Sequence, residues 1–445
     1  MNTRMSLMLA GLLLAGLPSA GRGQVAGGSS GQVAGGRAFN LAALQQAAID
    51  TDPRSRELQL FMQQADLRLR NISAQQLPTM VIDGQAQYQS DVAHLATSLP
   101  GVSALFLPPK DTFDAGIRLD QRLVDTTVSA QGALERAQLA ENQARVRTTL
   151  FELRQRVNDA FFAAAALEAR AGALAATIED LNARLREANA RVQEGTVLGA
   201  DSAAIEATLL QRQQDADDLQ ASRRAALARL ATLTQQPIAG TDTLVLPDVA
   251  AAVAQARQSQ GTLRARPEYE QFARTRDRLV RQQELTAAQE RPRLSTYGRI
   301  GYGKPGLNFA QSEFESYALG GLRLQWNAWT WGSGARERQA LAIQQQIVAA
   351  DEAAFARSLT TAIEGDEAAI DRLQRALAID ERIVMLREQV DRSTQIRLQE
   401  GVVTASDYLD RNAELLQARF ARAGHEVELA QASAHLLTTL GLEVR

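Results

Sequence analysis

The sequence predicts a mainly α-helical protein with a small β part, in which a strand pair and long antiparallel helices of coiled-coil type occur twice. The composition favours long helices, because Ala, Gln, Arg, Glu and Leu dominate and Pro is scarce in the middle of the chain. Two stretches align without a gap, Arg-Val-Gln-Glu-Gly-Thr-Val-Leu-Gly-Ala-Asp at 191–201 and Arg-Leu-Gln-Glu-Gly-Val-Val-Thr-Ala-Ser-Asp at 397–407. Each ends a long helical pattern and turns at a glycine, and a small polar residue is expected to start the next helix.

The prolines repeat in the same way as these two tips. A helical segment that Pro53 opens and Pro78 ends has a counterpart between Pro267 and Pro292, and both offsets are 214 residues. An architecture this long that occurs twice indicates a duplication.

Charge and cysteine content exclude several classes of function. The formal net charge of −3 and the absence of a basic run give no electrostatic basis for binding nucleic acid. The chain has no cysteine, which excludes disulfides, thiol catalysis, cysteine-ligated metal sites and lipid attachment through an N-terminal Cys.

Residues 1–23 have the pattern of a secretory signal peptide. The apolar core from Met5 to Leu17 is followed by small residues, and cleavage after Ala20 or Gly23 is expected. Because no later run of about 18 apolar residues occurs, we expect no transmembrane helix, so a membrane-embedded form requires a barrel. Residues 24–37 form a Gly-rich linker.

The first structural repeat spans residues 38–237. It begins with a helical segment that Asp52-Pro53 interrupts, and the restart is expected at Pro53. The hydrophobic period then changes from 3.6 to 2, which predicts strands at 79–89 and 113–123. Apolar side chains alternate with charged and amide side chains in both strands, a pattern that suits a barrel with lipid outside and water inside.

The longest helix of this repeat is predicted at 126–193. It contains no proline, keeps apolar steps of three and four, and would be about 100 Å long at ~1.5 Å per residue. A tip and a shorter helix at 201–235 follow. Residues 238–265 are interpreted as a connecting segment of the equatorial region.

The second structural repeat spans residues 266–442 and keeps the same order. The sequence predicts a helix, strands at 294–302 and 317–326, a long helix at 335–399, a tip, and a helix at 406–440. All three tryptophans fall where a strand meets a long helix, at positions Trp326, Trp329 and Trp331. This placement favours a bilayer interface, and core packing at the junction is the alternative.

The chain resembles the TolC family of outer-membrane efflux and secretion channels from Phe39 to Leu442. The resemblance depends on the doubled order of elements and on the second tip, Glu-Gly-Val-Val-Thr-Ala-Ser-Asp-Tyr-Leu-Asp at 400–410. It implies a homotrimer whose twelve strands close one barrel in the outer membrane, continued by an α-helical tunnel through the periplasm of a Gram-negative cell. It implies no cofactor.

The resemblance also implies a function and partners. The trimer would be the passive exit duct of a tripartite efflux pump or a type I secretion system. It would contact outer-membrane lipid, a periplasmic adaptor (a membrane fusion protein) and, through the adaptor, an inner-membrane transporter.

The family closes its periplasmic end with acidic residues, which correspond to Asp407 and Asp410 here. Three residues apart on a helix, they share a face, and threefold symmetry would make them rings of carboxylates that favour cations. The alternative is that Asp407 caps its helix and Asp410 is solvated. An aromatic and a basic residue that hold the closed state in family members correspond to Leu398 and Val403, which can form neither that hydrogen bond nor that salt bridge.

The resemblance implies that both tips dock the adaptor. The glycines allow the reversal, and the valines are expected to be exposed apolar side chains that need a partner. The predicted docking residues are Arg191, Glu194, Gly195, Thr196, Val197, Arg397, Glu400, Gly401, Val402 and Val403.

Two other classes of protein are alternatives to a channel. Catalysis is disfavoured, since the histidines His94, His425 and His435 are scattered without metal-ligand spacing, and no catalytic or metal-binding residue is predicted. A soluble periplasmic coiled-coil scaffold or adaptor protein is the second alternative, although no lipoyl-like β module lies between the helical arms.

Overall fold

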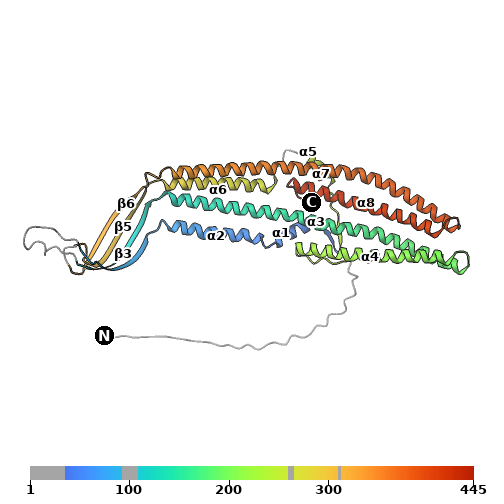
Figure 1. Cartoon of the computed structure of the whole chain (residues 1–445). Coiled ribbons are helices and arrows are strands. Elements are labelled where there is room, and N and C mark those ends of the chain that lie inside the picture. Colours follow the sequence, from blue (N-terminus) through green and yellow to red (C-terminus); the bar gives the residue numbers. More distant parts are fainter. Residues whose placement is uncertain (1–35, 93–108, 259–264, 309–311, 445) are drawn as a thin grey trace, which may run out of the picture.

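The computed structural model describes residues 36–92, 109–258, 265–308 and 312–444 of the 445-residue chain. The predicted signal peptide, most of the Gly-rich linker and His94 lie outside the described residues. The molecule is elongated, with a small sheet at one end and long helices that run away from it (Figure 1).

The described elements follow the predicted order, with three short additions, β1, β4 and α5. They are β1 (Ala38–Asn40), α1 (Leu41–Thr51), α2 (Ser55–Ala74), β2 (Thr79–Tyr88), β3 (Asp111–Val124), α3 (Thr126–Gln193), α4 (Gly199–Thr234), β4 (Thr243–Val245), α5 (Ala250–Gln258), α6 (Pro267–Gln289), β5 (Arg293–Lys304), β6 (Glu315–Gln325), α7 (Ser333–Gln399) and α8 (Ala405–Thr439).

The four longer strands form one antiparallel sheet in the order β2-β3-β5-β6. The central pairing of β3 with β5 joins the two repeats. Within the described chain, β2 and β6 each have one partner strand, so the outer edge of each presents unpaired backbone groups.

The register of this sheet separates two chemically different faces. The face that we call the apolar face carries large side chains that are mostly exposed; Ile82 is 74% exposed and Ile300 is 70% exposed. Its large members are Met80, Ile82, Phe113, Ile117, Leu119, Ile300, Tyr302, Leu322 and Leu324. The opposite, polar face carries Asp83, Gln85, Asp114, Arg118, Arg299, Tyr317 and Arg323. The predicted alternation of the strands is confirmed.

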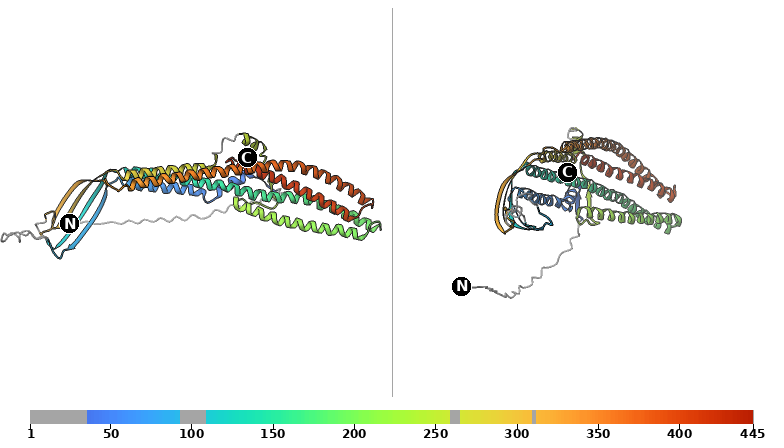
Figure 2. Two further views of the ribbon diagram at one scale, coloured as in Figure 1. Left: turned by 45° about the horizontal axis from the view of Figure 1, so that its top comes forward. Right: turned by 60° about the vertical axis from the view of Figure 1, so that its left-hand side comes forward.

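Two helices of nearly equal length, α3 with 68 residues and α7 with 67, run from the sheet to the far end of the molecule. Next to the sheet the helices pack in the order α2–α3–α6–α7, and in the far half in the order α4–α3–α8–α7. Figure 2 shows that these helices form a curved layer rather than a closed bundle. The layer therefore has two free edges, α2 with α4 on one side and α7 on the other.

The main core lies at mid-length, where the short helices of the two halves meet. Leu44 of α1, Phe161 of α3 and Leu436 of α8 are buried there. The segment at 238–265, interpreted from sequence as a connection, contributes β4 and α5 to this core, with Leu244 and Val253 buried. Strand β4 pairs in parallel with β1.

Some helix starts differ from the prediction. Pro53 lies in the turn before α2, whereas Pro267 is the first residue of α6 as predicted. The tip helices begin after Leu198 and Thr404, slightly earlier than expected, so the first is not started by a small polar residue.

Among the described residues, one helix, α3, is long and apolar enough over 18 residues to cross a membrane, although the sequence predicts no transmembrane helix. Core helices of soluble proteins meet the same criterion. Helix α3 packs against α2, α4, α6 and α8 along its length, and these contacts explain why it is so apolar.

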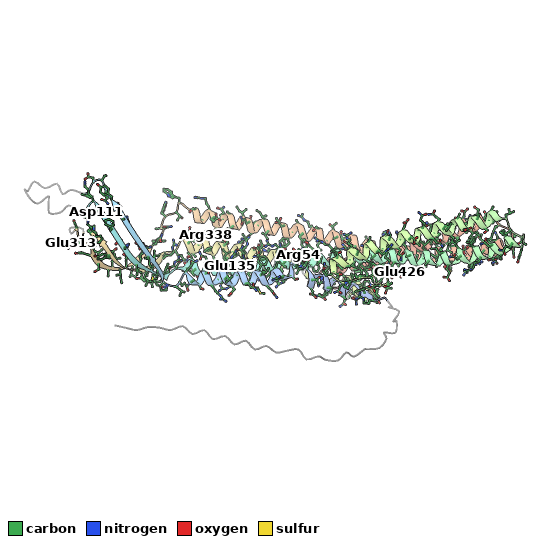
Figure 3. The ribbon with its side chains drawn as sticks, turned by 90° about the horizontal axis from the view of Figure 1, so that it is seen from below. Arg54, Asp111, Glu135, Glu313, Arg338 and Glu426 are labelled. Atoms are coloured by element: carbon green, nitrogen blue, oxygen red, sulfur yellow. The ribbon has the colours of Figure 1, made fainter. Side chains whose placement is uncertain are left out.

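The side chains labelled in Figure 3 show where different parts of the sequence lie along the molecule. Asp111 and Glu313 lie at the outer end of the sheet, Arg338 and Glu135 on the adjoining helices, and Glu426 towards the tips (Figure 3).

Candidate functional site: the paired helix tips

The two tips lie side by side at the end of the molecule farthest from the sheet (Figures 1 and 2). At the first tip the amide of Thr196 donates to the carbonyl of Arg191 at 2.9 Å, and the amide of Gly195 donates to the carbonyl of Val192 at 3.0 Å. This pair of bonds is a Schellman motif, which satisfies the last helical carbonyls and requires a residue at positive φ. Gly195 has φ of +73°.

The second tip repeats this backbone geometry. The amide of Val402 donates to the carbonyl of Arg397 at 2.8 Å, the amide of Gly401 donates to the carbonyl of Leu398 at 3.1 Å, and Gly401 has φ of +72°. Glycine is required at both positions because other residues adopt this conformation only with strain.

The next helices begin differently. Thr404 caps α8 in a capping box, in which its hydroxyl accepts from the amide of Asp407 and its own amide donates to the Asp407 carboxylate at 3.1 Å. The matching residue of the first tip, Leu198, has no side-chain cap bond. The second helix start is therefore fixed more firmly.

The apolar side chains that are exposed at the tips are only in part those that the sequence predicts. Val402 is 68% exposed as expected, whereas Val197 and Val403 are half-buried. Leu198, which the analysis did not single out, is 74% exposed. The exposed apolar pair at the tips is therefore Leu198 and Val402.

A small cavity of about 40 Å³ separates the two tips. Its walls include Val197 and Ile205 from the first tip region and Leu398 and Ala405 from the second. The guanidinium of Arg191 lies 3.5 Å from the carbonyl oxygen of Leu398. Leu398 thus packs between the tips, and its side chain has no hydrogen-bonding group.

The two acidic residues of the predicted gate have different surroundings. Both are exposed on α8. The hydrogen bonds from Thr404, first from its hydroxyl and then from its backbone, lower the pKa of Asp407, so this carboxylate is ionised and already bonded. Thr404 is the cap and Asp407 completes the capping box as the third residue of the helix, so Asp407 does serve the helix start, as the alternative expected, although not as the cap residue itself. Asp410 forms no hydrogen bond or ion pair with any described residue.

A buried polar network that sequence reasoning missed lies behind the tips. The Tyr408 hydroxyl donates to Asp180 Oδ2 at 2.5 Å, and Asn412 Nδ2 lies 3.4 Å from the same oxygen. Asp391 of α7 is also buried, and it lies near Asn412. Tyr408 and Asn412 are four residues apart on the face of α8 that Leu415 continues, and this core-facing spacing of polar residues was the available signal.

The polar face of the sheet carries a second network. Arg299 bonds Asp83 at 2.7 Å and also Asp114, and the Tyr317 hydroxyl donates to Asp114 at 2.5 Å. Gly301 makes room for the Tyr317 ring, since an added Cβ would lie 2.4 Å from it. These contacts tie the four strands together across their polar side.

The three tryptophans are all exposed at the junction of the sheet and α7, so core packing within this chain is not their role. Trp326 Nε1 donates to the carbonyl of Glu290 at 3.0 Å, and the rings of Trp329 and Trp331 meet edge to face. Their place at a membrane interface stays a prediction.

Among the described residues, no group of three His, Cys, Asp or Glu side chains is arranged to hold a metal ion. His425 and His435 of α8 face single aspartates of α7 instead, Asp380 at 2.6 Å and Asp366 at 2.7 Å. They therefore serve the packing of these two helices.

Comparison with known proteins finds likeness in structure. No family model matches the sequence, and no curated protein matches it. The outer-membrane protein VceC of Vibrio cholerae superimposes with a TM-score of 0.66 at 16% identity, over 91% of this chain and 97% of VceC.

Two further solved structures give the same result. The outer-membrane channel OprN has a TM-score of 0.65 at 17% identity, over 90% of this chain and 89% of OprN. The open state of the MtrE outer-membrane channel of Neisseria gonorrhoeae has a TM-score of 0.64 at 17% identity, over 91% and 89% of the two chains. This chain therefore has the TolC-like fold that these outer-membrane channels share.

Proposed function

We propose that this protein is an outer-membrane channel of a Gram-negative cell, the passive exit duct of a tripartite efflux pump or a type I secretion system. The observation that carries the proposal is the four-stranded sheet, which leaves its apolar face largely exposed and, among the described residues, the outer edges of β2 and β6 unpaired. Strands of 10 to 14 residues have the length that crosses a bilayer when tilted. Lipid would cover the apolar face, and the polar face would line the water-filled lumen.

Closure of the barrel would use the free edges of several copies. Edge strand β6 of one copy would pair with β2 of the next, which leaves no open edge in the membrane. Two copies would give eight strands, whose interior side chains fill the lumen, whereas three copies give twelve and an open conduit. The assembly proposed is a homotrimer with cyclic symmetry, the number of copies that the resemblance to the TolC family implies.

The helical layer has matching free edges. Along its far half, α7 exposes an apolar stripe at steps of three and four, Ile379, Ile383, Leu386 and Val390. On the opposite edge, α2 exposes Leu60, Met62 and Leu67, and α4 exposes Leu210. The spacing of the α7 stripe is typical of helix packing, and a neighbouring copy would cover it and the exposed side chains of α2 and α4 to complete a tunnel through the periplasm.

The tips are proposed to dock a periplasmic adaptor protein, and through it an inner-membrane transporter. They are the part of the chain farthest from the sheet, and they expose Leu198 and Val402 together with the backbone turns at Gly195 and Gly401. VceC, OprN and MtrE are described as outer-membrane proteins or channels, which supports the placement of this chain in the outer membrane.

Fractionation and bilayer recording test the channel against a soluble scaffold. We expect the processed protein in the outer-membrane fraction, with heat-modifiable migration on gels, and stepwise conductance when the purified protein is added to planar bilayers. A soluble scaffold would appear in the periplasmic fraction and would not conduct. Recovery of a soluble monomer without conductance would refute the proposal.

Asp410→Asn is expected to lower the preference of the channel for cations severalfold, because a ring of unpaired carboxylates in a narrow pore attracts cations and repels anions. Asp407→Asn is the matched comparison: its carboxylate is bonded to Thr404, so a smaller change is expected. The reversal potential in a salt gradient measures both. If neither Asp410→Asn nor the double variant changes it, these residues are not the gate.

A further inference from the structure

The charged side chains on the polar face of the sheet are sorted by sign along the strands. At the end next to the helices, this face carries Arg122 of β3, Arg293 of β5 and Arg323 of β6. Arg122 and Arg323 both lie opposite Ser295, one on each side of β5, and Arg293 is two residues from Ser295 in the same strand. Because residues two apart in a strand point to the same face, the three arginines form one group, which we call the arginine belt.

The other end of the polar face is acidic. It carries Asp83 of β2, Asp114 of β3 and Glu315 of β6, on the side of the sheet that lies farthest from the helices. The one basic side chain among these three carboxylates is Arg299, which bonds both Asp83 and Asp114. Each copy of the chain therefore has a surplus of negative charge at this end, which we call the acidic band.

The arginine belt keeps a surplus of positive charge, because it has few acidic partners. Arg122 pairs with Asp125 at 3.1 Å, whereas Arg293 and Arg323 form no ion pair with any described residue. The guanidinium of Arg323 lies over the ring of Tyr297, 5.1 Å from its centroid. Nε of Arg293 is buried and has no hydrogen-bond partner within the described chain. Two of the three guanidinium groups thus lack a carboxylate.

Two other carboxylates in this region are already paired with arginines outside the belt. Asp120, on the same face of β3, bonds Arg118 at 2.8 Å, and Glu290, just before β5, bonds Arg338 at 2.5 Å. Neither can neutralise the belt without leaving its own partner. A guanidinium presents a fork of donors that matches a carboxylate or a phosphate group. The belt is therefore suited to an oxyanion that the chain itself does not supply.

We propose that the arginine belt binds anionic solutes, those that carry phosphate or carboxylate groups, as they pass through the barrel. The proposal rests on the proposed channel function, in which the polar face lines the lumen. The arginines without ion pairs, two from each of three copies, would then form one ring at the junction of the barrel and the helical tunnel. Rings of arginine favour anions, and the low-dielectric wall of a pore concentrates their field in the lumen.

The order of the two charged zones gives the lumen a polarity. An anion that arrives through the tunnel meets the arginine belt first, whereas an anion outside the cell meets the acidic band first. The acidic band would therefore hinder the entry of anions from outside, and the belt would retain those that come from the tunnel. The ring of Asp410 proposed at the narrow tips has the opposite sign and limits the current. Binding is thus a more direct measure of the belt than conductance.

Arg293→Gln combined with Arg323→Gln tests the belt, since it removes the two arginines that have no ion pair. The probe is inorganic tripolyphosphate, and its binding to the purified full-length protein in detergent is measured by titration calorimetry. At low salt the double variant should bind at least about tenfold more weakly than the wild type, the usual effect of losing hydrogen bonds between charged groups. Raising the salt from about 0.01 M to about 1 M should weaken wild-type binding, because the Debye length falls from ~30 Å to ~3 Å.

Arg145→Gln combined with Arg422→Gln is the matched control. It removes the same charge from exposed positions of α3 and α8, where neither arginine forms an ion pair with a described residue. Tripolyphosphate should bind to this variant as it does to the wild type. An equal loss of affinity in both double variants would mean that binding follows the total charge of the protein, which refutes the belt.

The outcomes separate this proposal from the proposed function. If the wild-type protein forms no channel in bilayers, the proposed function fails. If it conducts, and the variant without Arg293 and Arg323 binds tripolyphosphate as tightly as the wild type, the belt is refuted and the channel stands. If that double variant does not assemble, Arg323→Gln alone decides, because the Arg323 side chain is exposed and its loss leaves the strand pairing intact. Unchanged affinity in Arg323→Gln then refutes the belt.

Discussion

Ile82→Arg is expected to prevent insertion of the protein into the outer membrane. Ile82 lies in the middle of β2 on the apolar face, opposite Ile117 of β3, and is almost fully exposed in the isolated chain. An arginine at the bilayer midplane costs about 2–4 kcal/mol, so three copies would lose roughly 6–12 kcal/mol, which equals the stability of an ordinary protein. The heat-modifiable band in the outer-membrane fraction should disappear.

Gln85→Arg is the matched control for Ile82→Arg. It introduces the same side chain three residues away in the same strand, on the polar face, opposite Asp114. There the guanidinium would meet water and a carboxylate, so the variant should insert like the wild type. Loss of both variants, or insertion of both, would show that the two faces of the sheet are not lipid and lumen.

Local signals predicted the long helices well. Helix α3 has the predicted bounds because Asp125 caps it, with a carboxylate that accepts from the Thr127 amide, and because no proline interrupts the following 68 residues. Both glycine turns were also predicted from local sequence, because a helix end that needs a positive φ usually has a glycine at that position. The change of hydrophobic period from 3.6 to 2 predicted where the four strands lie in the sequence.

Features that depend on distant partners were missed. Strands β1 and β4 have three residues each and exist because they pair with each other across about two hundred residues. Asp180 and Tyr408 are separated by 228 positions, so no local pattern joins them, and only the packing of α3 against α8 does. Burial of Val197 likewise depends on the second tip, which closes the cavity that this side chain lines.

The two tips show which parts of the duplicated unit are shared and which have diverged. Their backbone turns are the same, bond for bond, at Gly195 and Gly401. Their helix starts differ, because Thr404 and Asp407 form a capping box where the first tip has Leu198 without a side-chain cap. The spacing of Thr404 and Asp407 is itself a capping-box signal, so this difference was readable in the sequence.

Gly401→Val is expected to abolish transport by the complete pump while the trimer stays assembled. Gly401 has φ of +72°, and nothing lies within 4 Å of an added Cβ, so the penalty is backbone strain and not a clash. A non-glycine residue in this conformation costs about 1–2 kcal/mol, and a β-branched residue costs more. The turn would relax, and Val402 would lose both its bond to Arg397 and its place on the tip surface.

Gly172→Val in α3 is the control, because it makes the same chemical change where φ is negative and an added Cβ also meets nothing within 4 Å. It should transport normally, with a small gain in helix propensity, because Val is a better helix former than Gly. Export is measured with the co-expressed pump, and assembly by gel migration without heating. The tips lie at the far end from the sheet, so strain there should leave barrel closure unaffected. If Gly401→Val loses the trimer as well as transport, Gly401 serves folding. If Gly401→Val transports normally, the shape of this tip does not matter for docking.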